Sequence, residues 1–182
     1  QNLQAAEINN IASIFRKRFG DKFHENHILA DYTTFGIGGP ARMFIYCDKR
    51  EDIIDAVNLA HENKMDFFIV GGGSNLLISD NGYPGLIIHI ANTGLEVTDD
   101  YIEVEAGYDW EELVDYTCRE GLGGLVDMAG IKGQVGGAVY GNAGAFGTSV
   151  ADILIEAEIM KSGEEPRWEK NNYFAFSYRN SI

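Results

Sequence analysis

The sequence predicts an α+β protein with two lobes, and three observations support this fold class. In the first half of the chain, apolar runs at strand spacing alternate with segments at helical spacing, which is typical of a compact α/β unit. In the second half, short alternating strands and one helix begin near residue 93. Each half also holds a glycine-rich region, where the backbone can adopt positive φ and approach another molecule closely.

Composition and charge limit the classes of partner. The 182 residues are 45% hydrophobic and 12% aromatic, which is typical of a globular chain that can form a core. The net charge of −14 argues against nucleic acid or an anionic membrane as the main partner, because such surfaces require concentrated Lys and Arg. No apolar run approaches the ~18 residues of a membrane span, and residues 1–30 lack the apolar core of a signal peptide. We therefore expect a cytoplasmic protein.

Cysteine usage gives no sign of a metal centre. Cys47 and Cys118 lie far apart, without a Cys-x-x-Cys pair or clustered His residues. Neither a disulfide framework nor a zinc site is therefore predicted, and we expect two buried thiols.

Residues 1–29 are expected to form an N-terminal helical segment. Within it, residues 7–19 place Ile and Phe side chains at helical spacing, and Gly20 ends the pattern. Residues 30–92 are the first expected lobe, which begins with a glycine-rich loop at 32–40. The elements expected after this loop are a strand at 43–46, a helix at 50–63 and strands at 67–70 and 86–90.

The first lobe is organised around the stretch VGGGSNLL at residues 70–77. Apolar runs lead into and out of three glycines, and Ser74 and Asn75 add short side chains that tolerate turn geometry and donate hydrogen bonds. Successive amides in such a turn can form a nest for an anion such as a pyrophosphate. The alternative interpretation is an ordinary glycine-rich turn between two strands.

Residues 93–182 are the second expected lobe. Asp109 is placed to cap a helix, and Gly121 lies where a C-terminal glycine cap belongs. Further along, Gly163 indicates a turn, with Trp168 on the strand that follows it. The elements expected in this lobe are short strands at 95–98 and 101–106, a helix at 110–120 and a strand at 150–160.

The region from Gly121 to Gly147 is dense in glycine. Residues 136–138 and 142–145 present backbone with almost no side-chain cover, which suits a flat ligand such as an isoalloxazine or adenine ring. The alternative interpretation is a tightly packed helix-and-turn segment whose small residues only admit neighbouring elements.

Five blocks of sequence occur in the order seen in a known family. They are TFGIGGPA at 34–41, GGGSNLL at 71–77, AGIKGQVGG at 129–137, NAGAFG at 142–147 and YRNS at 178–181. With these blocks, the chain from about residue 28 onward resembles the UDP-N-acetylenolpyruvoylglucosamine reductase family. The resemblance implies the N-terminal FAD-binding portion of such an enzyme, with the two-lobed FAD-binding fold of vanillyl-alcohol oxidase and p-cresol methylhydroxylase.

The resemblance also implies an activity. In that family NADPH reduces a non-covalently bound FAD, and the reduced flavin passes hydride to the enolpyruvyl group of a UDP-sugar, giving UDP-N-acetylmuramate for peptidoglycan synthesis. An FAD-dependent oxidoreductase with a UDP-sugar substrate and NADPH as transient reductant is therefore expected. The sequence leaves the choice between NADPH and NADH open, because no Rossmann fingerprint is evident. It also leaves the oligomeric state open.

The resemblance implies roles for particular residues. Arg179 matches the catalytic arginine, whose guanidinium stabilises negative charge on the substrate carboxylate as hydride arrives. Tyr178 either hydrogen-bonds near the substrate or packs. The cofactor-binding residues that the resemblance implies are Gly71, Gly72, Gly73, Ser74, Asn75, Leu76, Ile131, Gly136, Gly137, Asn142, Ala143, Gly144 and Ala145.

The chain departs from the family pattern at several positions. Lys132 replaces a usual proline, Gln134 a small hydroxyl residue, and Val126 a usual glutamate. The family's proton-donating serine and its second catalytic acid, a glutamate, belong to a part that follows position 182, and Ser181 is not that serine. We therefore expect this chain by itself to hold FAD without turnover.

Two other functions are compatible with the residues. One is an FAD oxidase of the same fold that acts on another small alcohol or sugar through a covalently attached flavin, although no His or Cys lies in a motif for such a link. The other is a flavin-binding or structural module without turnover. Flavin that remains on acid-precipitated protein would indicate the covalent oxidase.

Overall fold

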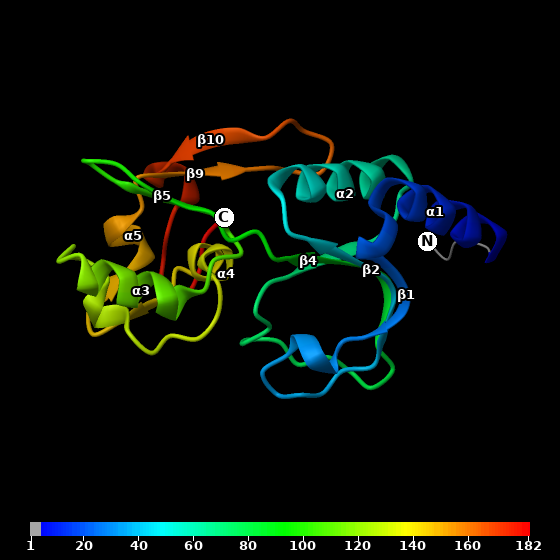
Figure 1. The fold of residues 1–182 in the computed structure, drawn as a ribbon, viewed down its shortest axis with the longest axis horizontal. Coiled ribbons are helices and arrows are strands. Elements are labelled where there is room, and N and C mark those ends of the chain that lie inside the picture. Colours follow the sequence, from blue (N-terminus) through cyan, green and yellow to red (C-terminus); the bar gives the residue numbers. More distant parts are fainter. Residues whose placement is uncertain (1–4) are drawn as a thin grey trace. The chain divides into compact units, whose positions relative to one another are not determined.

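The computed structural model describes residues 5–182 and divides into two compact units (Figure 1). The first unit ends at Ala91, and the second is Asn92–Ile182. No helix in the described part of the chain is long and apolar enough to cross a membrane. The two units are described separately below.

The first unit is built around a sheet with the strand order β1-β2-β4-β3. β2, β4 and β3 run parallel, and β1 pairs antiparallel with β2 at the edge. The helices and strands of this unit are α1 Ala5–Phe19, β1 Phe23–Ile28, β2 Pro40–Cys47, α2 Arg50–Glu62, β3 Phe67–Val70 and β4 Tyr83–Ile90. Short 3₁₀ turns, η1 Gly20–Lys22 and η2 Ala30–Tyr32, lie before and after β1. The predicted helices and the three predicted strands of this region are confirmed.

β1 is a strand that the sequence analysis missed. It lies within residues 1–29, where only a helical segment was expected, yet it pairs with β2 from Phe23 opposite Ile45 to Ile28 opposite Pro40. Phe23 is its buried residue, and the rest of the strand is exposed or half-buried. A polar edge strand lacks the apolar alternation that identifies strands in sequence, so its conformation depends on pairing with β2.

Both faces of the central strands are buried. Figure 1 shows α2 along one face of the sheet, with the loops that follow β1 and β3 on the other. Under these loops, a buried cluster that includes Phe44 and Ile87 is covered by Tyr32, Leu76 and Ile78. Burial on two faces explains why β2 and β4 carry nearly continuous apolar runs.

The second unit is built from two-stranded antiparallel sheets and short helices. The strands are β5 Leu95–Val97, β6 Ile102–Val104, β7 Gly144–Ala145, β8 Thr148–Ser149, β9 Glu156–Ile159 and β10 Arg167–Lys170. The helices are α3 Trp110–Arg119, α4 Val135–Tyr140 and α5 Val150–Ile153, with 3₁₀ turns η3 Val126–Met128 and η4 Asn171–Phe174. Asp109 caps α3 as predicted, since its Oδ1 accepts from Glu112 N at 3.0 Å, and Gly121 after the helix has φ +70°.

The strand predicted at 150–160 was wrong over its first part. Residues from Val150 to Ile153 form α5, and the strand β9 begins only at Glu156. The cause is local, because Ser149 and Asp152 form a capping box in which the Asp152 carboxylate accepts from the Ser149 amide at 2.8 Å and its hydroxyl at 2.9 Å.

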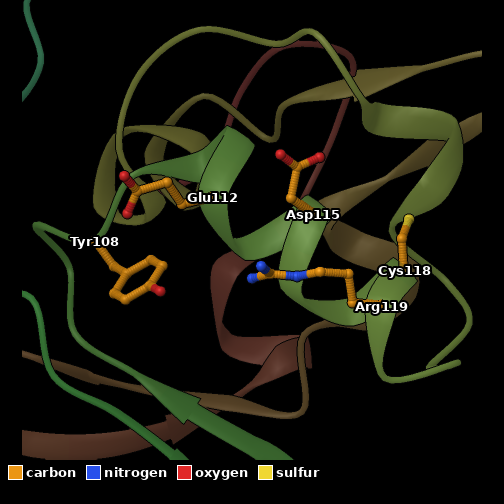
Figure 2. Close-up of a pocket in the computed structure, with 5 residues that line it drawn as sticks. All are labelled: Tyr108, Glu112, Asp115, Cys118 and Arg119. Carbon is orange, nitrogen blue, oxygen red and sulfur yellow. The ribbon is translucent and has the colours of Figure 1, made fainter.

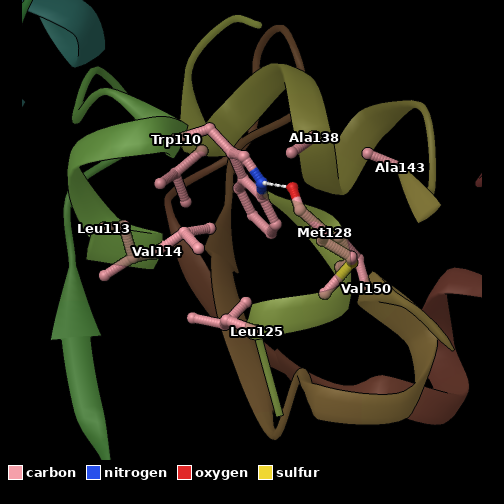
Figure 3. Packing of buried hydrophobic residues seen from close by; sticks show 9 residues of the cluster. Trp110, Leu113, Val114, Leu125, Met128, Ala138, Ala143 and Val150 are labelled. Carbon is pink, nitrogen blue, oxygen red and sulfur yellow. Dashed lines mark hydrogen bonds between the residues drawn. The ribbon is translucent and has the colours of Figure 1, made fainter. Parts of the chain in front are cut away.

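Trp110 at the start of α3 is central to the core of this unit (Figure 3). Its indole Nε1 donates to the carbonyl oxygen of Met128 at 3.2 Å, and both residues are buried. The other buried members of this cluster are Leu113, Val114, Leu125, Val135, Ala138, Ala143 and Val150. Because these residues come from α3, from α4 and the segment before it, and from the chain that follows α4 as far as α5, the core fixes the glycine-rich region against α3.

We predict that Trp110→Phe lowers the free energy of unfolding by about 1–3 kcal/mol, because it leaves the buried Met128 carbonyl without its donor and opens a void. Trp168→Phe is the matched control, since Trp168 is 52% exposed and its loss should cost less than about 0.5 kcal/mol. Urea unfolding followed by far-UV circular dichroism measures both variants. Equal losses in the two would contradict the prediction.

Candidate functional site

The predicted loop of residues 71–76 lies between β3 and β4, which are parallel neighbours. Within it, Gly73 is buried and has φ +62°, and a Cβ at this position would lie 2.0 Å from the carbonyl oxygen of Tyr32. The Gly73 carbonyl accepts a hydrogen bond from Thr34 N at 3.3 Å. Position 73 therefore requires glycine for two reasons, namely its positive φ and its close contact with the preceding glycine-rich loop.

The same two loops meet again where β2 and β4 begin. Gly39 N donates to Ser79 O at 2.9 Å, and a Cβ on Gly39 would lie 2.0 Å from Asp80 O. Gly82 has φ +74°, and its Cβ would lie 1.9 Å from Pro40 O. Contacts between backbones thus join the two loops at both ends, and side chains at these glycines would force them apart.

The amides of Gly72 and Gly73 are the backbone donors of this loop that bear on ligand binding. Among the described residues, neither Gly72 N nor Gly73 N donates a hydrogen bond, although Gly73 is buried. Asn75 is exposed, whereas Leu76 packs on the buried cluster below. Two successive amides without an acceptor can bind an anionic oxygen.

The glycines at the start of α4 differ from one another. Gly136 N donates to Ala106 O at 2.8 Å, and a Cβ on Gly136 would lie 3.0 Å from the Cβ of Ala106. Gly137 is exposed, and no atom lies within 4 Å of its Cβ position. Gly136 therefore permits close packing inside the unit, while Gly137 leaves open backbone at the surface. Ile131, in the loop before α4, packs against the core cluster.

Asn142 and Ala143 follow α4 and are buried. Asn142 has φ +41°, its Oδ1 accepts from Ala151 N at 3.0 Å, and its Nδ2 donates to Ser177 O at 2.9 Å. Gly144, in the β7–β8 hairpin, would place a Cβ 2.7 Å from Thr148 O, and Ala145 next to it is half-buried. The Asn142 side chain thus joins α5 and the C-terminal segment to the end of α4.

Arg179 lies in a turn that the end of α4 holds in place. Ser177 and Asn180 exchange backbone hydrogen bonds of 3.0 and 3.2 Å, with Arg179 at φ +55° between them. The turn is anchored by the Asn142 bond to Ser177 and by Ser181, whose hydroxyl donates to Tyr140 O at 2.7 Å. Arg179 itself is exposed, with its Cζ 5.9 Å from the Tyr178 ring centroid.

Tyr178 is 91% exposed, so the structure does not support the interpretation that it packs.

Two of the residues that depart from the family pattern are used in local structure. Lys132 forms an ion pair with Glu111 of α3, and this hydrogen bond raises the pKa of the lysine. Gln134 bridges to Asp109 and precedes α4 as its N-cap residue. Val126 is exposed in η3. The positive charge of Lys132 is therefore directed toward α3.

A pocket of about 460 Å³ lies along α3 and contains none of the predicted site residues (Figure 2). The pocket is lined by Tyr108, Glu112, Asp115, Cys118 and Arg119. Figure 2 shows the Arg119 side chain pointing back along the helix toward Tyr108. With one cation and two carboxylates among its five lining residues, the pocket is more polar than a site for a flavin ring usually is.

The two cysteines have different environments. Cys47 is buried, as predicted, and burial raises the pKa of its thiol to about 12, so it is unreactive at neutral pH. Cys118 is exposed, which corrects the expectation of two buried thiols. In the described part of the chain, no group of His, Cys, Asp and Glu residues could hold a metal ion.

Comparison with known proteins decides the family. A family model described as an FAD binding domain matches residues 41–166. The chain belongs to this FAD binding domain family. The matched range includes the loop at 71–76 and the segment at 131–145, and it ends before Arg179. FAD as the cofactor of this domain, predicted from the sequence, is thereby confirmed.

The FAD binding domain is also similar to curated reductases. The chain is 35% identical over 175 residues to the UDP-N-acetylenolpyruvoylglucosamine reductase of Bacillus velezensis. This alignment covers 95% of this chain and 58% of that protein. The chain spans about half the length of the curated relatives that it matches. The predicted resemblance to the FAD-binding part of these reductases is therefore confirmed.

Solved structures confirm the predicted fold class. The crystal structure of UDP-N-acetylenolpyruvylglucosamine reductase from Thermus caldophilus matches with a TM-score of 0.70 at 34% identity, covering 85% of this chain and 55% of that one. p-Cresol methylhydroxylase matches with a TM-score of 0.65 at 14% identity over 92% of this chain and 36% of that one, which shows the fold alone.

We predict that Gly73→Ala destabilises the first unit by more than Gly36→Ala. Both positions have positive φ, at +62° and +65°, so in both variants an alanine in this conformation lowers the free energy of unfolding by about 1 kcal/mol. Only at position 73 does the added Cβ meet a backbone oxygen, whereas nothing lies within 4 Å at position 36. Urea unfolding measures the difference, and equal destabilisation would contradict the close contact with Tyr32.

Proposed function

We propose that residues 71–76 hold the pyrophosphate of FAD through backbone amides. The observation that carries this assignment is that neither the Gly72 amide nor the Gly73 amide donates a hydrogen bond within the described residues, although Gly73 is buried. An anionic oxygen would satisfy both groups. The free amides therefore fit a diphosphate, which a protein of net charge −14 otherwise has few cations to hold.

We further propose that the ring systems of FAD lie against the open backbone of Gly137 and the segment of residues 142–145. The exposure of Gly137, with no atom near its Cβ position, supports this assignment. Gly136, Asn142 and Ala143 hold the segment in place through the contacts described above, and Ile131 packs beneath it. No His or Cys lies in these segments, which supports non-covalent binding.

For the whole protein, we propose NADPH-dependent reduction of an enolpyruvyl UDP-sugar to UDP-N-acetylmuramate, a step of peptidoglycan precursor synthesis in the cytoplasm. The names of the curated relatives support the substrate. When bound, FAD supplies the hydride. Arg179 binds the substrate carboxylate with two hydrogen bonds and stabilises the negative charge that develops there, because a guanidinium stays charged and presents paired donors.

The proposed cofactor site predicts that the chain retains FAD after excess cofactor is removed, as seen in its visible absorption. Gly137→Ala should weaken FAD binding about tenfold or more, because a methyl group would enter the contact plane. The free energy of unfolding should stay equal or rise by up to about 1 kcal/mol, since alanine is more favourable than glycine within the helix α4. Gly123→Ala is the control, because Gly123 is also exposed with nothing within 4 Å. A chain that retains no flavin would contradict the proposed site.

The proposed role of Arg179 predicts a split between the two half-reactions of the full-length reductase. Arg179→Lys should slow reoxidation of the flavin by the enolpyruvyl UDP-sugar by about 10²–10³-fold, because the paired donors are lost. Reduction by NADPH should be unchanged. Anaerobic stopped-flow absorption separates the steps, and Arg119→Lys, in the pocket on α3, is the control. An unchanged reoxidation rate would exclude Arg179 from catalysis.

A further inference from the structure

A cluster of aromatic and histidine rings lies between the first sheet and its glycine-rich loops. Tyr32 of η2 is at its centre, with ring centroids 4.7 Å from Phe44, 5.4 Å from His27 and 4.8 Å from His89. The Tyr32 hydroxyl also lies 3.1 Å from His27 Nε2. Rings from β1, β2 and β4 therefore hold one tyrosine from the loop.

This tyrosine is joined to the proposed pyrophosphate loop through its backbone. Its carbonyl oxygen lies 2.0 Å from the position that a Cβ of Gly73 would occupy, and the Thr34 amide, two residues later, donates to the Gly73 carbonyl. From the sheet side, His89 pairs in register with Val70, the residue that precedes Gly71. A shift of Tyr32 would therefore move the amides of residues 72 and 73.

Burial favours the neutral form of both histidines of the cluster. Burial lowers the pKa of His27, and the ring of His24, stacked on it at 4.9 Å, lowers it further, whereas Asp31 acts in the opposite direction. Burial also lowers the pKa of His89 and the charge of His27 lowers it further, whereas a hydrogen bond with the Val70 backbone raises it. His89 Nδ1 has no hydrogen-bond partner among the described residues. The phenols facing this group are Tyr32 itself and Tyr46 of β2, and the pKa of Tyr32 is raised, mainly by burial.

We propose that Tyr32 is a positioning residue for the anion-binding amides of residues 72 and 73, and that protonation of His27 and His89 releases it and weakens FAD binding. The link to FAD rests on the proposed function, because it assigns the pyrophosphate to this loop. The link between the ring cluster and the loop geometry is independent of that assignment.

The sign of the effect follows from proton linkage. The closed cluster binds protons less readily than an opened one, in which each histidine has its ordinary pKa of about 6.5. The closed arrangement is therefore fully favoured above about pH 6.5 and loses its advantage as the pH falls below that value. Between about pH 7.5 and 5.5, each histidine shifts the equilibrium toward the open arrangement by up to about tenfold.

The first experiment measures amide hydrogen exchange by NMR on the chain without FAD. The Thr34 amide, bonded to Gly73 O, lies beside the cluster, while the Gly39 amide, bonded to Ser79 O, joins the same loops at their other end. After correction for the intrinsic rate, the protection of Thr34 should fall about tenfold or more between about pH 7.5 and 5.5. Protection of Gly39 should fall much less.

Variants test whether the histidines cause this change. His27→Gln/His89→Gln removes both titrating rings and should abolish the pH dependence at Thr34, and His61→Gln, on α2, is the control that should retain it. Tyr32→Phe keeps the ring and loses only the hydroxyl, so it covers the case in which the double variant fails to fold. It should lower the protection of Thr34 at about pH 7.5 by about threefold to tenfold.

The second experiment measures the FAD dissociation constant over the same pH range. An increase of about tenfold or more at acid pH in the natural chain, absent in the double variant, supports the proposal. If Thr34 protection depends on pH as predicted but the chain binds no FAD at any pH, the proposed function fails and the positioning role of Tyr32 stands. Thr34 protection that stays constant with pH, or changes equally with that of Gly39, overturns the proposal.

Discussion

Within each unit, backbone contacts that only glycine permits hold the segments proposed to bind FAD in place. Gly73 lies against Tyr32 in the first unit, and Gly136 lies against Ala106 in the second. In each case the neighbouring glycine, Gly72 or Gly137, is exposed. One glycine of each pair thus brings two segments close together, and the other leaves backbone open for a ligand. The proposed site depends on these close contacts, because a side chain at Gly73 or Gly136 would displace the exposed backbone of the neighbouring glycine.

Side chains around the site mostly bond to the protein itself. Asn142 uses its amide group to join α5 and the turn at 177–180 to the end of α4, and Ser181 bonds to Tyr140. The groups that remain for an anionic ligand are backbone amides and the Arg179 guanidinium. This division suits an acidic protein, because amides bind anions without adding cations to the surface. The ring cluster around Tyr32 also carries little charge, because burial favours the neutral form of its histidines.

Much of the fold could be predicted because its signals are local. Asp109 caps α3 through the amide three residues later, and the helices α1 and α2 follow apolar spacing along their own sequence. The strand β1 could not be predicted in this way, because its polar residues pair with β2 only after the chain returns. The helix α4 was expected only in the alternative interpretation of the glycine-rich region, since its two glycines disfavour a helix that packing nevertheless stabilises.

The sequence by itself determined the fold class, the FAD binding family and the positions of the glycine-rich segments, because these are properties of order and spacing along the chain. It could not show which glycines are packed and which are open, or that Asn142 would bond to Ser177, 35 residues away. Only the tertiary structure decided these points. The physical reason is that the space beside a glycine, and the partner of a buried amide, are supplied by backbone from distant parts of the chain.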